Sequence, residues 1–148
     1  MVDVSDIGRR LAPVTAHVEP GRLRFFRRTL GETNPVYCDP ESARSAGFRD
    51  LPVPPTYLFC LEMMDADDPF AFLEELRMDI SRILHGEQSF SYLAPVCVGD
   101  TLTFRTAVGD VTEKKGGALT LVTMTTEIVN QAGLDVARAT RVLVVRNG

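Results

Sequence analysis

The sequence predicts one α+β domain, with helices in the first half of the chain and antiparallel strands in the second half. Before Ile83 the apolar residues recur at the three- and four-residue spacing of helices, and from Ile83 onward they alternate with polar residues at the two-residue spacing of strands. Helices and strands that are segregated along a chain are typical of α+β domains rather than of alternating βαβ units. The 148 residues are enough to bury a core, and residues 1–148 are predicted to form that single domain.

The first elements are a short strand at residues 14–18 and a helix that begins at Pro20. Proline is favoured in the first turn of a helix because its missing N–H is not needed there. Leu23, Phe26 and Leu30 follow at helical spacing and predict the apolar face of this helix. The opposite face carries Arg22, Arg24, Arg27 and Arg28.

A second, shorter helix is predicted between Asp39 and Gly47. Asp39 is suited to cap its amino-terminus, and Pro40 occupies the first helical position. Ala43 and Ala46 lie inside the helix, and Gly47 is expected to end it in the left-handed conformation.

A third helix, Tyr57–Met64, is apolar almost all round, which predicts burial on most sides. It follows a proline-rich approach at residues 51–56 that is unsuited to regular structure. Another helix is expected to open at Asp68 and Pro69. Its apolar side consists of Phe70, Leu73 and Leu76.

Alternation at the two-residue period predicts four long strands, beginning near Ile83, Thr101, Ala118 and Leu134. Gly-containing turns at residues 98–100, 114–117 and 131–133 separate them, so an antiparallel meander is expected. One apolar helix and a strongly bent sheet are both buried when the sheet wraps around the helix. This arrangement is the hot-dog fold.

Composition and charge exclude several classes of function. A formal net charge of -4 gives no basic field for nucleic acid. The amino-terminal residues carry acids without an apolar run, so no secretory signal, no membrane partner and a cytoplasmic location are expected. Three widely spaced cysteines and two histidines argue against disulfides and against a metal site, and no cofactor is expected.

The segment Gly31-Glu32-Thr33-Asn34-Pro35-Val36-Tyr37 resembles the signature of the MaoC-like (R)-specific hydratases and dehydratases. In that family the segment reads Gly-Asp-x-Asn-Pro-aliphatic-His, and the Asp and His are the catalytic pair. Here Glu32 and Tyr37 occupy those two positions. The likeness extends nearly end to end and is greatest to the amino-terminal-half type of MaoC domain, through Pro54-Pro55-Thr56 and Leu84-His85-Gly86-Glu87-Gln88.

The resemblance implies a reaction that adds water to an enoyl thioester or removes it from a 3-hydroxyacyl thioester. Such a reaction needs a base for water and donors for the thioester oxygen, and the unpaired N–H groups near Thr56 to Leu58 are the expected donors. The predicted catalytic residues are Glu32, Tyr37 and His85. The predicted substrate-binding residues are Asn34, Pro55, Thr56, Tyr57 and Gly86.

Glu32 extends its carboxylate one methylene further than aspartate, and Tyr37 offers a hydroxyl that donates a hydrogen bond rather than an imidazole that accepts a proton. A purely structural role is an open alternative for each. Asn34 would then bond the local backbone, and His85 would be a strand-end or subunit contact.

Two other clusters have competing interpretations. The arginines of the first helix, with Arg9 and Arg10, either contact carrier phosphates or form a solvated face. Glu62 and Asp65 on the third helix occupy the place where hot-dog thioesterases carry a catalytic carboxylate, or else mark the wet end of that helix. Cys60 is interpreted as a small core residue.

Together these features predict a subunit of a dehydratase or hydratase that binds an acyl chain carried on coenzyme A (acyl-CoA) or on acyl carrier protein (acyl-ACP). The resemblance implies pairing with a second hot-dog subunit that bears the intact Asp and His. Two alternatives stay open. One is a self-sufficient homodimer with Glu32 as base and Tyr37 or His85 as donor, and the other is a non-enzymatic thioester-binding scaffold.

Overall fold

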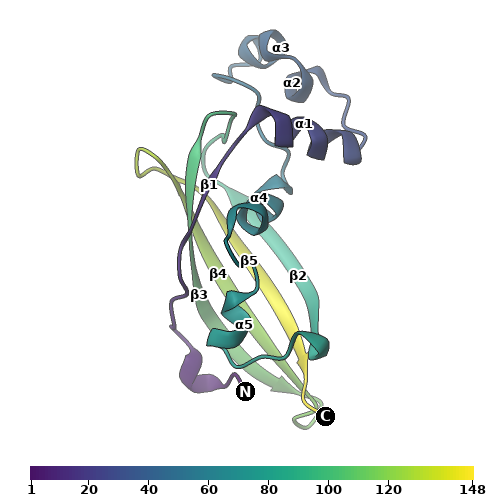
Figure 1. Cartoon of the computed structure of the whole chain (residues 1–148), viewed down its shortest axis with the longest axis vertical. Coiled ribbons are helices and arrows are strands. Elements are labelled where there is room, and N and C mark those ends of the chain that lie inside the picture. Colours follow the sequence, from purple (N-terminus) through teal and green to yellow (C-terminus); the bar gives the residue numbers. More distant parts are fainter.

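A five-stranded antiparallel sheet curls around one helix in the computed structural model, which describes residues 1–148 (Figure 1). The predicted α+β hot-dog fold is therefore confirmed. The strand order is β1-β3-β4-β5-β2. The strands are β1 (Val14–His17), β2 (Ile83–Tyr92), β3 (Thr101–Lys114), β4 (Leu119–Asn130) and β5 (Asp135–Arg146).

The predicted meander is correct for β3, β4 and β5, which pair in sequence order. It is wrong for β2, which pairs with β5 at the far edge of the sheet instead of with β3. Alternation fixes which face of a strand is apolar but not which neighbour it pairs with. As a result β1 and β2 are the two edge strands.

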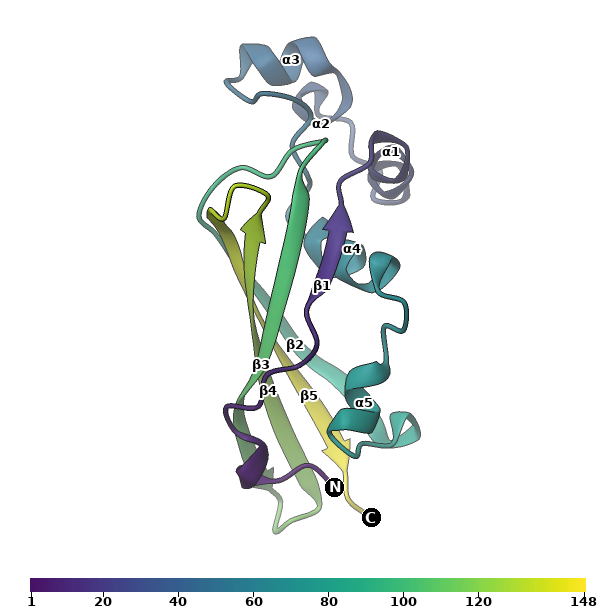
Figure 2. The same ribbon diagram turned by 60° about the vertical axis from the view of Figure 1, so that its left-hand side comes forward.

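The helices form two groups (Figures 1 and 2). Three lie beyond one end of the sheet, and α4 and α5 lie on its concave face. Short 3-10 turns occur at Val4–Asp6 and Ile80–Arg82. The helices are α1 (Pro20–Thr29), α2 (Pro35–Cys38), α3 (Pro40–Ser45), α4 (Tyr57–Asp65) and α5 (Ala71–Glu75).

The predicted capping of α3 is confirmed. The Asp39 carboxylate accepts a hydrogen bond from Ser42 N at 2.8 Å, and Gly47 has a φ of 93°. The helix α2 was not predicted. It begins at Pro35, and four residues are too few for an apolar period to be visible.

Two predicted helix faces differ from the structure. Helix α5 begins at Ala71 rather than at Pro69, because the Asp68 carboxylate accepts a hydrogen bond from Phe70 N at 2.8 Å and holds a turn there. Phe70 is exposed, as is Leu30 at the end of α1, so neither contributes to the core.

Two apolar clusters form the core on the concave face. One surrounds α4 and the other lies under α5. Tyr57, Leu58 and Leu61 of α4 are fully buried against inward-facing residues of β3 and β4 such as Phe104 and Ile128. The inward residues follow the predicted alternation along each strand.

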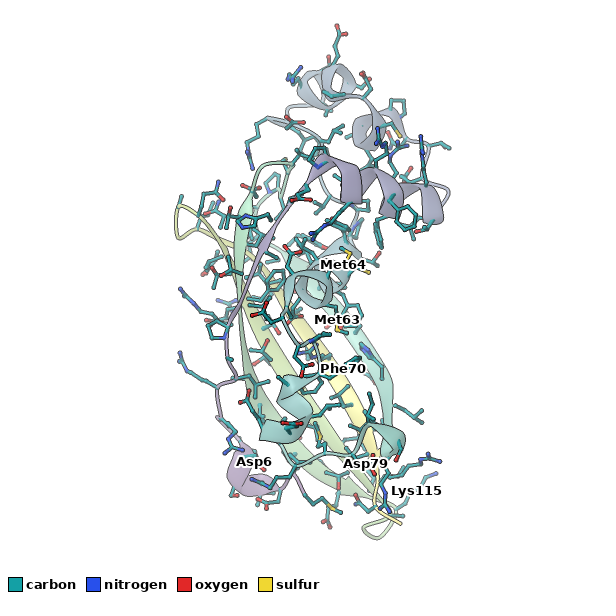
Figure 3. All side chains as sticks on the ribbon, in the orientation of Figure 1. Asp6, Met63, Met64, Phe70, Asp79 and Lys115 are labelled. Carbon is teal, nitrogen blue, oxygen red and sulfur yellow. The ribbon has the colours of Figure 1, made fainter.

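The other side of α4 is not covered by the chain, which corrects the predicted burial on most sides. Phe59, Cys60 and Met63 are only partly buried, and Met64 is 47% exposed. Figure 3 shows Met63 and Met64 projecting from α4 on its open side. An apolar helix face left uncovered within one chain suits contact with another.

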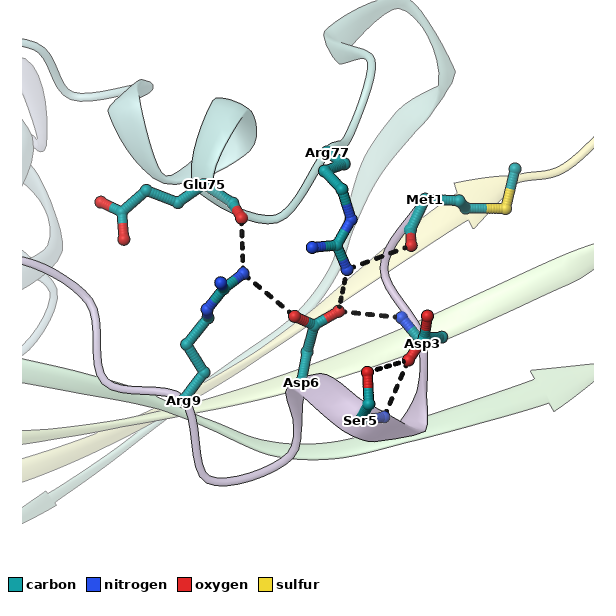
Figure 4. A network of polar contacts seen from close by, with 7 residues as sticks. All are labelled: Met1, Asp3, Ser5, Asp6, Arg9, Glu75 and Arg77. Atoms are coloured by element: carbon teal, nitrogen blue, oxygen red, sulfur yellow. Dashed lines mark hydrogen bonds and ion pairs between the residues drawn. The ribbon is translucent and has the colours of Figure 1, made fainter.

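The amino-terminal turn is attached to the end of α5 by a buried carboxylate (Figure 4). Asp6 is 4% exposed and accepts hydrogen bonds from Asp3 N at 3.1 Å, Arg9 Nη1 at 3.0 Å and Arg77 Nη2 at 2.6 Å. Arg9 also donates to the Glu75 carbonyl oxygen at 2.7 Å. These contacts occupy Arg9, which was one of the candidates for contacting carrier phosphates.

Candidate functional site

The family-like motif forms a closed turn between α1 and α2. Gly31 has a φ of 65°, the left-handed conformation that favours glycine. The Glu32 carboxylate accepts a hydrogen bond from Asn34 N at 2.8 Å, and Asn34 Oδ1 accepts one from Val36 N at 3.1 Å. Asn34 therefore bonds the local backbone, and one oxygen of Glu32 is engaged in the same turn.

Arg27 supports this turn from α1. Its Nη1 lies 3.4 Å from the Glu32 carbonyl oxygen and 2.9 Å from Cys38 Sγ, and its side chain is half-buried. Arg27 was expected on a solvated or phosphate-binding face. Its contacts instead hold the motif against the start of α2.

Tyr37 faces a cavity of about 360 Å³ beside the approach to α4. Pro55 and Tyr92 line the same cavity, and the Tyr92 hydroxyl donates a hydrogen bond to the Pro55 carbonyl oxygen. Burial, with a smaller contribution from Tyr37, raises the pKa of Tyr92 to about 12. Tyr92 is therefore a hydrogen-bond donor at neutral pH, which the sequence did not identify as part of the site.

The start of α4 supplies fewer free donors than expected. Tyr57 N donates to the Pro54 carbonyl oxygen at 3.0 Å, which removes it from the set of candidate oxyanion donors. Thr56 is exposed at the N-cap position and its side chain makes no capping hydrogen bond. The Tyr57 ring packs in the core, 5.0 Å from that of Phe26, and its buried hydroxyl has no hydrogen-bond partner.

His85 and Gly86 lie elsewhere, near the start of β2. His85 Nε2 is 3.1 Å from the Glu87 carbonyl oxygen, and the His85 ring meets that of Phe59 at 5.2 Å. The β2–β5 register shifts at Gly86, where an added Cβ would lie 3.0 Å from Val144 Cγ2. Glycine is needed there for close approach of the strands.

The predicted catalytic residues therefore do not gather into one cluster within one chain. Tyr37 belongs to α2, which lies beyond the end of the sheet (Figure 1), and shares a cavity with the approach to α4. Glu32 lies in the turn before α2. His85 is close to the other end of β2 and makes no hydrogen bond to either of them. The catalytic roles of all three stay predictions.

Sequence reasoning missed a polar cluster inside the fold and misplaced Glu62. The side chain of Glu62 is only 14% exposed, so it does not mark the wet end of α4. Glu62 Oε1 lies 3.7 Å from Arg141 Nη2 and 3.4 Å from Thr106 Oγ1, and Thr106 contacts Thr126 at 2.8 Å. A signal was present, because Thr106, Thr126 and Arg141 are in phase with the buried apolar residues of their strands.

Asp65 is also less exposed than expected, with 11% of its side chain accessible. Its carboxylate is paired with Arg22 and accepts a hydrogen bond from His17 N at 2.8 Å. Arg22, a candidate for carrier phosphates, is thus engaged by α4. Asp65 fixes α4 to both β1 and α1.

Burial raises the pKa of Glu62 above its ordinary value of 4.5, opposed by Arg141 and Thr106. Between the unfolded and folded pKa values the folded state then binds more protons than the unfolded state. We expect the wild type to gain stability as the pH falls through the folded pKa toward 4.5, and Glu62→Gln to lack this gain. Urea unfolding of both proteins from about pH 8 to about pH 5 measures the difference. The prediction would be contradicted if the free energy of unfolding of the two proteins changed equally with pH.

The curled sheet, the central helix and the motif turn beside that helix define a MaoC-like hot-dog protein. Among solved structures, the truncated HadBC (3R-hydroxyacyl-ACP dehydratase) complex from Mycobacterium tuberculosis matches with a TM-score of 0.81 and 24% identity, over 97% of this chain and 98% of that one. The (R)-hydratase from A. caviae involved in PHA biosynthesis matches with a TM-score of 0.70 and 24% identity, over 93% and 94%. At these identities the likeness establishes the fold.

The chain belongs to the FAS1-like dehydratase domain region family, whose pattern matches residues 5–139. A relative called UPF0336 protein in Streptomyces avermitilis is 35% identical over 151 residues, covering 98% of this chain and 95% of the relative. Another of that name in Clavibacter michiganensis subsp. michiganensis is 39% identical over 139 residues, covering 93% and 91%. No helix in the structure combines the length and apolar character needed to cross a bilayer.

Proposed function

We propose that this chain is one subunit of an (R)-specific 3-hydroxyacyl-thioester dehydratase or enoyl-thioester hydratase, in which a second hot-dog subunit performs the proton transfers. The proposal rests on the two positions of the motif where this chain differs from the family. Glu32 is hydrogen-bonded within its own turn, and Tyr37 stands where the family has histidine. A hydrogen-bond donor at that position does not replace a base.

In this proposal the chain provides a wall for the acyl thioester. Tyr37, Pro55 and Tyr92 line a mostly apolar cavity next to the start of α4. An acyl chain is suited to such a lining. Thr56, the exposed residue that follows Pro55 in the chain, precedes α4. The carrier is coenzyme A or acyl carrier protein.

The uncovered side of α4 and the free edge of β2 support a partner of the same fold. A strand at the edge of a sheet leaves a row of backbone groups for another chain to pair with. Some proteins of this fold are solved as complexes of two different subunits. The ChsH1-ChsH2 complex from Mycobacterium tuberculosis matches with a TM-score of 0.75 and 20% identity, over 95% of this chain and 86% of that one.

The test is to assay the purified chain with a 2-enoyl-coenzyme A, first alone and then with any second hot-dog protein that co-purifies with it. We expect the chain alone to be at least about a hundredfold less active than the pair, because a positioned acid or base contributes about that much or more. Full activity of the chain alone would refute the proposal. It would instead favour the self-sufficient homodimer.

Glu32→Gln in each preparation separates the roles of Glu32. The amide oxygen of glutamine still accepts from Asn34 N but cannot take up a proton. We expect the pair to keep its activity, which would make Glu32 structural. Saturable binding of the acyl thioester without turnover in any pairing would instead identify a scaffold.

A further inference from the structure

A second cavity, of about 600 Å³, lies away from the motif. Its walls are the segment leading into β1, the carboxyl-terminal end of α4 and the start of α5, which lie side by side in Figure 2. Leu11, Pro13, Met63 and Phe72 give it apolar surface. The volume is in the range of small-molecule sites, and nothing in the proposed function uses it.

One of the residues that line this cavity is an arginine that donates no side-chain hydrogen bond within the chain. Arg141 is 8% exposed, and its buried Nε has no hydrogen-bond partner. Glu62 Oε1, at 3.7 Å from Nη2, is close enough for charge pairing but beyond hydrogen-bond distance. The guanidinium carbon lies 5.2 Å from the centre of the Phe72 ring, which holds the group in place. Because the Nε itself is enclosed, a molecule in the cavity would accept from the Nη groups of Arg141.

The charges around the cavity indicate which acceptor fits. Glu62 offsets the charge of Arg141, and further carboxylates surround the opening, so the net field is negative. Such a field opposes a carboxylate or a phosphate, whereas an uncharged carbonyl oxygen accepts from Arg141 without that repulsion. The ionisable lining residues are Glu62, Asp65, Asp67, Asp68, Glu75 and Arg141.

We propose that this cavity binds an uncharged aliphatic molecule through a carbonyl oxygen, which accepts hydrogen bonds from the Arg141 guanidinium. The aliphatic part lies against Leu11, Pro13 and Phe72. The site is independent of the motif cavity, and occupation leaves the charge pairing of Glu62 and Arg141 in place. The ligand class is therefore a neutral aliphatic amide, ester or ketone.

The test uses three probes of equal chain length, octanamide, octanoate and octylammonium, with the full chain in its purified oligomeric form. The side-chain Nε–H resonance of Arg141 reports binding by nuclear magnetic resonance. We expect octanamide to shift this resonance saturably. Octanoate, and octylammonium, which has no carbonyl oxygen to accept from Arg141, should each bind at least about tenfold more weakly. Arg141→Met lacks that resonance, so titration calorimetry measures its affinity and that of the wild type for octanamide. The affinity should fall by about tenfold or more in the variant, because a charge-assisted hydrogen bond is lost.

Ala71→Trp provides a second variant that keeps Arg141. Ala71 is exposed and lines the opening of the cavity, so a large side chain there should block octanamide without disturbing the core. Ala132→Trp, in the turn between β4 and β5, is the matched control and should bind normally. The proposal is overturned by octanoate binding as tightly as octanamide, by unchanged binding in Ala71→Trp, or by no saturable shift. Turnover plays no part in this readout, so failure of the proposed function would not affect it.

Discussion

Met64→Lys is expected to weaken assembly with the proposed hot-dog partner while leaving the chain folded. Met64 is 47% exposed near the end of α4, where lysine is compatible with the helix because its charge favours a carboxyl-terminus. If a partner covers this side of α4, the ammonium group is buried without a counter-charge. We expect the dissociation constant of the complex of the two subunits to rise by about thirtyfold or more, which is the effect of losing one central interface residue.

Sedimentation of the homodimer or of the co-purified pair measures this loss of association, and circular dichroism checks the fold. Leu134→Lys is the matched control, since Leu134 is 54% exposed in the turn between β4 and β5, away from α4. It should assemble as the wild type does. Assembly of Met64→Lys at wild-type affinity would mean that the open side of α4 is not the subunit interface.

The elements that the sequence predicted well are those whose signal is local. Alternation and the glycine-containing turns located the first residues of β3, β4 and β5 to within one residue. Asp39 and Gly47 located the two ends of α3 because their effects are local. Asp39 accepts a hydrogen bond from a backbone N–H of the first turn, and Gly47 adopts a positive φ. The hot-dog fold followed from combining these elements with the apolar helix α4.

The features that sequence reasoning missed depend on contacts between distant residues. β2 pairs with β5, and a two-residue period does not indicate which strand another strand will pair with. The apolar character of α4 has two causes, the core on one side and an uncovered surface on the other, and composition does not separate them. Glu62 appeared to be an end-of-helix acid because its partner Arg141 lies on the last strand.

The roles of the candidate site residues stay predictions. Resemblance named Glu32 and Tyr37, and the structure places Tyr37 in the cavity beside the approach to α4. Sequence alone did not reveal that Asn34 N holds the Glu32 carboxylate, or that Tyr92 faces the Tyr37 cavity. His85 is separated from both because a residue's position along a strand, and not only its type, decides which end of the sheet it reaches.

Leu61→Ala is expected to cause a large loss of stability. Leu61 is fully buried in the cluster where α4 meets the sheet, so truncation removes apolar contacts and leaves a cavity in a rigid setting. We expect a loss of about 2–5 kcal/mol in the free energy of unfolding, a large share of the total for a domain of this size. Urea unfolding at a fixed protein concentration measures it.

Leu30→Ala removes the same atoms from a residue that is 52% exposed, and should cost no more than about 0.5 kcal/mol. The comparison isolates burial from side-chain chemistry, because both variants delete an identical group. Since the sheet curls around α4, the cavity at Leu61 should also loosen the start of that helix and with it the Tyr37 cavity. Equal losses in the two variants would contradict a core that is centred on α4, and with it the structural basis for a site at the start of that helix.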